Sequence, residues 1–181
     1  MAMPVKKSRP KLETRNSPSR SSVRGPKSSR PVMPSVYGVP KTMTGGLTWD
    51  WARDRLTSSH NYLIATVRPD SRPHIMVVWG IWLENAYYFS TGSKTGKAKN
   101  LAENSNCVVC NENVEEAVIV EGEARQLAAS EIPEVAFDLY LKKYGWKLDP
   151  DLGPVFMVTP HVVFAMPEKL FPNGATRWRF E

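Results

Sequence analysis

Cysteine and histidine are scarce in this chain of 181 residues, which has two cysteines and three histidines. The histidines, His60, His74 and His161, are scattered without the spacing of metal ligands. The cysteines, Cys107 and Cys110, lie in a predicted strand, where residues three apart point to opposite faces. Neither a disulfide nor a shared metal is expected there. We therefore predict no metal site and interpret both cysteines as small strand residues.

Long hydrophobic runs are also missing, which excludes further classes of protein. No stretch is long enough to span a membrane, and no apolar segment follows the basic residues near the N-terminus as in a secretory signal. Gly92 and Gly96 are one residue too close for a P-loop, and Ala98 stands where a magnesium-binding Ser or Thr is needed. We expect a cytoplasmic protein with no membrane partner that is not a nucleoside triphosphatase.

The first 35 residues lack aromatic side chains and hold only one acidic residue, Glu13, against nine lysines and arginines. Their Ser- and Pro-rich composition cannot bury enough apolar surface to offset the entropy of ordering the chain. We predict a disordered basic tail over residues 1–35 and one folded domain over residues 36–181. A solvated extension is the favoured interpretation of the tail, and we do not expect nucleic acid as a partner.

The most informative stretch that the chain does contain runs from Ser90 to Leu101 and is rich in Gly, Ser, Thr and Lys. It follows an apolar, strand-like run and opens a predicted helix, in which Thr95 is a good N-cap and Gly96 lets a ligand approach the backbone. Lys97 and Lys99 add positive charge beside the free N–H groups of the first turn. These residues suit a phosphate group, although a solvated loop of ordinary type has the same composition.

Short apolar runs separated by turns predict an antiparallel meander in the rest of the domain. Strands are predicted at residues 61–67, 74–82, 86–90, 106–111, 117–125, 161–166 and 176–180, with a short strand or turn at 155–158 and the last strand exposed. Helices are predicted at residues 48–56, 95–103 and 131–144. The connections are too short for the crossover helices of a doubly wound fold. A closed or nearly closed barrel of about six strands is expected, too narrow to hold a large ligand inside.

Six motifs follow one another in a distinctive order: YLIATVRPDSRPH at 62–74, VWG at 78–80, YFST at 88–91, KAKNL at 97–101, EGEA at 121–124 and TRWRF at 176–180. In this order and spacing the chain resembles the pyridoxamine 5′-phosphate oxidase-like flavoproteins. These are the FMN-binding split-barrel proteins, which overlap the flavin/deazaflavin oxidoreductases. The resemblance runs from about residue 47 to the C-terminus. It implies a mainly β fold with a few short helices, a six-stranded antiparallel split β-barrel.

The resemblance also implies a homodimer with FMN bound where the two subunits meet. The backbone of one strand would line the isoalloxazine edge, the next strand would contact the flavin or its ribityl chain, and the loop and helix start would bind the 5′-phosphate. An aromatic residue of the partner's last strand would cover the ring. The cofactor-binding residues implied in this way are Met76, Val77, Val78, Trp79, Ser90, Thr91, Thr95, Lys97, Lys99 and Trp178. No catalytic side chain is implied.

The chain departs from the family pattern at several of these positions. Met76 replaces an arginine at the start of the flavin-contacting strand, Gly96 replaces the arginine before the phosphate-binding lysine, and Ala117 replaces a glutamine. Lys94 or Lys99 would supply the phosphate charge that is lost. The Arg/His cluster that binds substrate phosphate in a true pyridoxamine phosphate oxidase is not recognisable, so we do not predict vitamin B6 synthesis.

The implied function is an FMN-binding oxidoreductase that transfers hydride through flavin N5 to or from an unknown small molecule. One alternative keeps the fold and replaces FMN with a deazaflavin, coenzyme F420, whose long phosphate-bearing tail suits a groove lined by lysines. The other is a non-catalytic module that carries a flavin or haem. The residues of one chain do not specify the substrate, because a shallow pocket at the subunit interface selects it in this family.

Overall fold

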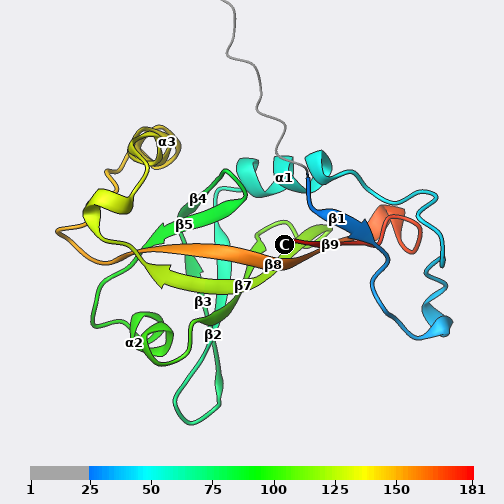
Figure 1. The fold of residues 1–181 in the computed structure, drawn as a ribbon, viewed down its shortest axis with the longest axis horizontal. Helices are drawn as coiled ribbons and strands as arrows, with labels where there is room; N and C mark the ends of the chain where they lie inside the picture. Colours follow the sequence, from blue (N-terminus) through cyan, green and yellow to red (C-terminus); the bar gives the residue numbers. More distant parts are fainter. Residues whose placement is uncertain (1–24) are drawn as a thin grey trace, which may run out of the picture.

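A computed structural model describes residues 25–181, and one antiparallel sheet forms its centre (Figure 1). The strands are β1 (Lys27–Ser29), β2 (Tyr62–Val67), β3 (Pro73–Val78), β4 (Gly80–Leu83), β5 (Ala86–Ser90), β6 (Asn106–Asn111), β7 (Glu116–Gln126), β8 (Val155–Pro167) and β9 (Thr176–Arg179). The helices are α1 (Trp49–Ser58), α2 (Gly96–Glu103) and α3 (Glu134–Tyr144), with short 3-10 turns η1 (Ser35–Tyr37), η2 (Ala129–Glu131) and η3 (Glu168–Leu170). In Figure 1, α1 lies above the sheet, and α2 and α3 lie near its left end.

The sheet forms a split barrel. Its strands follow the order β1-β9-β8-β7-β6-β2-β3, and β8 also pairs with β5, which pairs with β4. Because β3 and β4 are separated only by Trp79, the ring is completed by the chain itself and not by a hydrogen-bonded ladder between those two strands. The prediction of a mainly β, antiparallel split barrel is confirmed.

The strand predicted over residues 74–82 is in fact two strands, β3 and β4, and this part of the prediction was wrong. Val78 is the last residue paired with β2, and Gly80 is the first paired with β5. A Cβ atom at Gly80 would collide with the ring of Tyr87 and the carbonyl of Tyr88, so the chain passes β5 at a distance that only glycine permits. The strand changes partner at this close approach.

The barrel core is made by the inward residues of alternate strand positions. Ile64, Val109, Val120, Val158 and Val163 are fully buried, as period-two alternation requires. The helix predicted at residues 48–56 is confirmed as α1. It buries a face containing Ala52 and Leu56 against this core, and the Thr48 hydroxyl caps it by accepting the N–H of Trp51 at 3.3 Å.

The C-terminal half of the sheet differs from the prediction in two ways. The segments predicted at 155–158 and 161–166 form one strand, β8, whose ladder with β7 shifts register between Glu121 and Gly122. The last strand, β9, is not exposed, because it pairs with β8 on one side and with β1 on the other. Thr176 and Trp178 point from β9 into the interior.

The sheet begins earlier than the sequence predicted. Lys27–Ser29, within the segment predicted as a disordered tail, form β1, and residues 1–24 of that segment lie outside the described residues. Directly after β1, the Arg30 guanidinium donates to four carbonyl groups of two loops. The acceptors are Thr42 and Thr44 at 2.7 Å, and Asn173 and Ala175 at 2.6 Å. One side chain therefore fastens the segment after β1 to the loop before β9.

Candidate cofactor site at the split of the barrel

A cavity of about 290 Å³ opens where the strand splits. Four elements supply its walls: the end of β3, the end of β5, the first turn of α2 and helix α3. Five residues of the predicted cofactor set line it together, namely Val77, Val78, Trp79, Ser90 and Lys97. The sequence missed one lining residue, Tyr140 of α3, because the helical spacing of Val135, Leu139 and Tyr140 indicated only a packed helix face.

The strand beside this cavity leaves apolar side chains bare on both of its faces. Ile75 and Val77 are each 59% exposed, and Met76 between them is 47% exposed. Neighbouring residues of a strand point to opposite faces, so both faces of β3 are exposed at residues 75–77. β3 also lies at the edge of the sheet. Consecutive exposed apolar residues on an edge strand are typical of a surface that another molecule covers.

The first turn of α2 forms the polar side of the site. Thr95 is the N-cap, and its hydroxyl accepts the N–H of Ala98 at 3.4 Å and donates to the Gly92 carbonyl at 2.8 Å. The N–H groups of Gly96 and Lys97 have no acceptor within the helix, and the helix dipole makes this end positive. Burial lowers the pKa of Lys97, so a bound anion would stabilise its charged form.

A second cavity, of about 410 Å³, lies on the other side of α2. Lys99 lines this cavity and not the first one, because residues two apart on a helix point in nearly opposite directions. Arg68, Arg72 and His74 of the β2–β3 hairpin line it too, and Arg72 is paired with Asp70 at 2.7 Å. The structure therefore divides the two predicted lysines between neighbouring basic cavities that meet at the start of α2.

A chain of buried polar groups fixes α2 against the sheet. Asn100 is buried, and its side-chain amide donates to the Thr66 hydroxyl at 2.9 Å. That hydroxyl lies 3.4 Å from Nδ1 of His74 on β3. Because buried polar groups are costly unless they are paired, these contacts define how the helix start sits relative to β2 and β3.

Helix α3 holds the other side of the split. The N–H of Gly80 donates to the Tyr144 hydroxyl at 2.9 Å, and the Gly80 carbonyl accepts from Nζ of Lys143 at 3.0 Å. The Tyr144 hydroxyl has one proton, which reaches either the Gly80 or the His60 carbonyl, both at 2.7 Å. Its ring stacks on Trp79, with centroids 4.9 Å apart and planes 8° apart. α3 thus positions the residue at which the strand changes partner.

Three other residues of the predicted cofactor set, Met76, Thr91 and Trp178, do not line the cavity at the split. Met76 lies on exposed β3 but does not line the cavity, and the Thr91 hydroxyl lies 3.1 Å from that of Thr95. Trp178 is separated from all of them, because it is 1% exposed inside the barrel and packs edge-to-face on Trp49 at 5.5 Å. A ring enclosed in its own core is not available to cover a ligand of a partner subunit. The predicted role of Trp178 therefore does not agree with its position.

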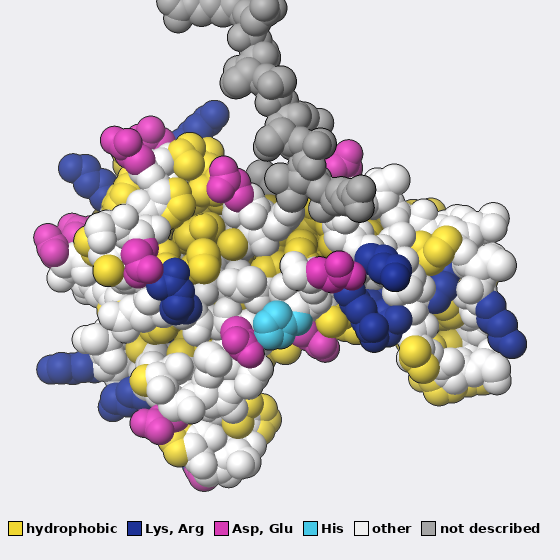
Figure 2. Space-filling view, viewed as in Figure 1, with side chains coloured by type: hydrophobic (Ala, Val, Ile, Leu, Met, Phe, Trp, Pro, Cys, Tyr) yellow, Lys and Arg dark blue, Asp and Glu magenta, His cyan; other side chains and the backbone are white. Residues whose placement is uncertain are grey.

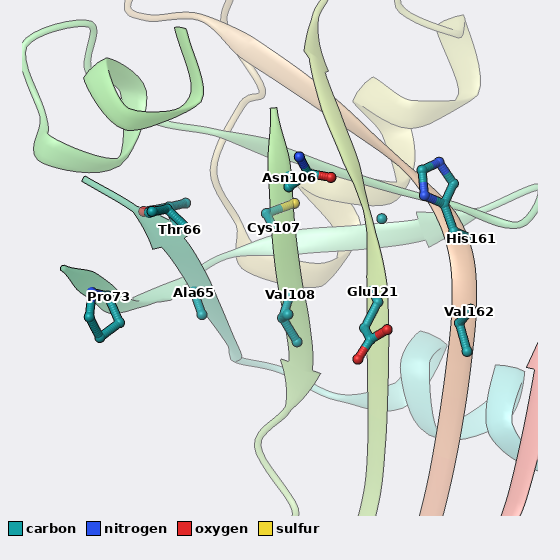
Figure 3. Close-up of a pocket in the computed structure, with 11 residues that line it drawn as sticks. Ala65, Thr66, Pro73, Asn106, Cys107, Val108, Glu121, His161 and Val162 are labelled. Carbon is teal, nitrogen blue, oxygen red and sulfur yellow. The ribbon is translucent and has the colours of Figure 1, made fainter. Parts of the chain in front are cut away.

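Another hollow, of about 480 Å³, lies on the outer face of β2, β6, β7 and β8, away from the predicted set. Figure 3 shows Val108, Glu121 and Val162 pointing the same way from three neighbouring strands. Cys107 lies at its edge, and burial raises the pKa of that thiol to about 12, so it stays protonated and unreactive at neutral pH. Within residues 25–181, no group of His, Cys, Asp and Glu side chains is arranged to hold a metal.

None of the described helices is long and apolar enough to cross a bilayer. A search of curated proteins finds no relative that matches this sequence. Solved structures do match, at identities that show the fold alone. A pyridoxamine 5′-phosphate oxidase-like protein of Listeria innocua is 16% identical with a TM-score of 0.55, over 65% of this chain and 96% of that one.

Two further structures are informative. An F420 reductase is 22% identical with a TM-score of 0.50, and the match covers 61% of this chain and 94% of that one. A heme binding protein from Mycobacterium smegmatis is 16% identical with a TM-score of 0.57, over 71% of this chain and 55% of that one. The sequence model of the pyridoxamine 5′-phosphate oxidase family matches residues 49–164, which is more than half of the chain and includes the split. The chain therefore belongs to the pyridoxamine 5′-phosphate oxidase family.

Proposed function

We propose that the protein binds FMN at the split of the barrel and is an oxidoreductase acting on a small molecule. The observation that supports this is the cavity in which β3, β5 and the first turn of α2 bring five predicted residues together. Bound FMN would supply hydride transfer at N5, and the protein would supply position and shielding from water.

The roles of the chain's own groups follow from their chemistry. The first-turn N–H groups of α2 and the Lys97 ammonium would neutralise a phosphate. Backbone groups of Val78 and Trp79, at the end of the β2–β3 ladder, would face the ring system. The Ser90 hydroxyl, at the end of β5, would hydrogen-bond a polar atom between ring and phosphate. No side chain is required as a general acid or base, and none is proposed.

The same site supports a homodimer. Apolar side chains are bare on both faces of β3, so one face suits the cofactor and the other suits a second copy of the chain. The outer hollow adds apolar surface from Ala65, Val108 and Val162 on the neighbouring strands (Figure 3). A second copy would also cover the ring, a role that Trp178 cannot serve from inside its own barrel.

The visible spectrum of the purified full-length protein, followed by titration with FMN, tests the proposal. We expect flavin bands or FMN binding, and Lys97→Met should weaken binding by about tenfold or more, because it removes a charge-assisted contact with phosphate. Lys94→Met, at an exposed loop position that lines neither cavity, is the matched control. Absence of FMN binding would overturn the proposal. A haem spectrum would instead favour the non-catalytic alternative, as in the similar heme binding protein.

The second candidate function is a coenzyme F420-dependent reductase on the same fold. The second basic cavity favours it, because Arg68 and Lys99 extend positive charge past the start of α2. A deazaflavin with a long phosphate-bearing tail would use that charge, whereas FMN ends at its phosphate. Parallel titrations separate the two candidates: Lys99→Met should weaken F420 binding and leave FMN binding unchanged. An equal effect on both cofactors would argue against the F420 candidate.

A further inference from the structure

A separate pocket of about 340 Å³ lies between α1 and α3, above β4. Thr57 and Ser58 of α1, His60, Ile81 and Trp82 of β4, and Leu139, Lys142 and Lys143 of α3 line it. It shares no lining residue with either cavity beside α2. Figure 2 shows hydrophobic side chains gathered between α3 and α1 on this face of the molecule.

The pocket has an apolar side and a positively charged side. Ile81 and Trp82 are buried and line it from β4, where they point to opposite faces of the strand, and Leu139 of α3 forms an apolar wall. Lys142 and Lys143 supply two ammonium groups, and none of the described residues that line the pocket is acidic. An apolar surface next to unopposed positive charge fits a ligand that is itself apolar at one end and anionic at the other.

Lys143 is the lining residue whose charge a bound anion would stabilise most. Its Nζ donates to the Tyr62 hydroxyl at 2.8 Å and to the Gly80 carbonyl at 3.0 Å, while its third contact, to the Thr57 carbonyl, is long at 3.5 Å. No carboxylate of residues 25–181 forms an ion pair with it. Burial lowers the pKa of Lys143 to about 8. A desolvated cation that lacks an ion-pair partner gains from pairing with an anion.

The other ionisable groups around Lys143 balance its charge only in part. Burial raises the pKa of Tyr62 and raises that of Tyr144 to about 12, so both phenols are neutral at physiological pH. Glu112 is the acidic group that acts on Lys143, and it opposes the effect of burial only in part. Its two carboxylate oxygens are taken by the N–H of His60 and the amide of Asn61, each at 2.8 Å.

We propose that this pocket binds a small amphipathic anion, with an aromatic or short aliphatic body and one carboxylate or equivalent head group. The body would lie against Leu139 and along β4 at Ile81 and Trp82. The head would pair with Lys143, with Lys142 beside it. The volume is near the lower end of the range for ligand pockets, roughly 300–1,000 Å³, so a molecule much smaller than a flavin nucleotide is expected. The proposal does not depend on the cofactor proposed for the split.

Two probes of the same shape, 2-naphthoate and 2-naphthamide, test the proposal on the full-length protein by calorimetric titration. The charged probe should bind at least about tenfold more tightly than the neutral one, because only its carboxylate pairs with Lys143. Lys143→Met should reduce naphthoate affinity to the level of the amide. Lys147→Met, at an exposed position just after α3 that lines no described pocket, should leave it unchanged.

Leu139→Trp gives a second test that does not require a change to the hydrogen bonds of Lys143. Leu139 is 36% exposed on α3, so the larger side chain can be accommodated by the fold while it fills the pocket, and naphthoate binding should be lost. Affinity in the unmodified protein should also fall as the pH rises from about 7 to 10, as Lys143 loses its proton.

Three results would overturn the proposal. One is equal binding of naphthoate and naphthamide. The second is unchanged naphthoate binding in Leu139→Trp. The third is loss of binding in Lys97→Met with retention in Leu139→Trp, which would assign the probe to the cavity at the split. None of these results bears on FMN binding itself, so failure here and failure of the proposed function are distinguishable.

Discussion

The two strands on either side of Trp79 have similar apolar sequences and opposite environments. On β3, Ile75 and Val77 are each 59% exposed, whereas on β4, Ile81 is 3% and Trp82 is 5% exposed. The difference comes from the helices, because α1 and α3 both pack on β4 while β3 forms the edge of the sheet. Apolar sequence alone therefore does not identify the core. An apolar strand such as β3, which no other part of the described chain covers at residues 75–77, indicates a binding surface.

The comparison is tested most strongly by truncating an equivalent side chain on each strand. Ile81→Ala should lower the free energy of unfolding by about 3 kcal/mol, because it leaves a cavity beneath α3. Val77→Ala should change the free energy by less than about 0.5 kcal/mol at protein concentrations where the chain is monomeric. Urea denaturation measures both values. Equal losses at low concentration would contradict the view that β3 is bare and β4 is covered.

The junction between the strands should tolerate no side chain. Gly80→Ala places a methyl group against the Tyr87 ring and the Tyr88 carbonyl, and we expect a loss of about 2 kcal/mol in stability. Gly25→Ala is the control, since nothing lies within 4 Å of the added atom. Thermal unfolding of the two variants provides the measurement. A stable Gly80→Ala protein would show that the close approach is not what divides the strand.

The contribution of α3 to the junction should be smaller. Tyr144→Phe keeps the ring that stacks on Trp79 and removes the hydroxyl that bonds Gly80, so a loss of about 1 kcal/mol is expected. Hydrogen exchange of the Gly80 amide should rise in the same variant. Tyr37→Phe, a partly exposed tyrosine on η1, is a matched control. Unchanged protection of Gly80 would mean that α3 does not hold the split.

The last prediction concerns pH. Burial lowers the pKa of Lys143 from 10.5 to about 8 in the folded protein, so between these values the unfolded chain binds more protons than the folded one. Stability should therefore rise with pH across that interval, and Lys143→Met should flatten the rise. Denaturation midpoints at several pH values compare the two proteins. If stability instead fell as the pH rose across this interval, Lys143 would already be paired with an anion in the folded protein.

Local features of the fold could be predicted from the sequence because neighbouring residues determine them. Thr48 caps α1 by its hydroxyl, and the short connection between the strands predicted at 74–82 and 86–90 is a tight turn with positive φ at Glu84 and Asn85, 50° and 64°. The loop before α2 was identified in the same way, since Thr95 and Gly96 act within one turn. Strand pairing with the nearest neighbours also follows from short connections.

Features that depend on distant residues could not be predicted. The division at Trp79 depends on the position of the Tyr87 ring, and the burial of Trp178 depends on Trp49 and on β1, which is more than a hundred residues away in the chain. Tyr140 reaches the cavity because α3 packs on β4, which no helical periodicity reveals. The separation of Lys97 from Lys99 was predictable from helix geometry, but which cavity each one lines was not.

Strands β3 and β4 are joined only through Trp79, and this connection alone completes the ring of strands. A circular permutant with new ends between Trp79 and Gly80 would leave β3 and β4 as two free edges, and the barrel would open into a curled sheet. New ends at the exposed turn between Asp70 and Ser71 would leave every ladder intact. In this molecule the continuity of the chain at one position replaces a whole row of interstrand hydrogen bonds.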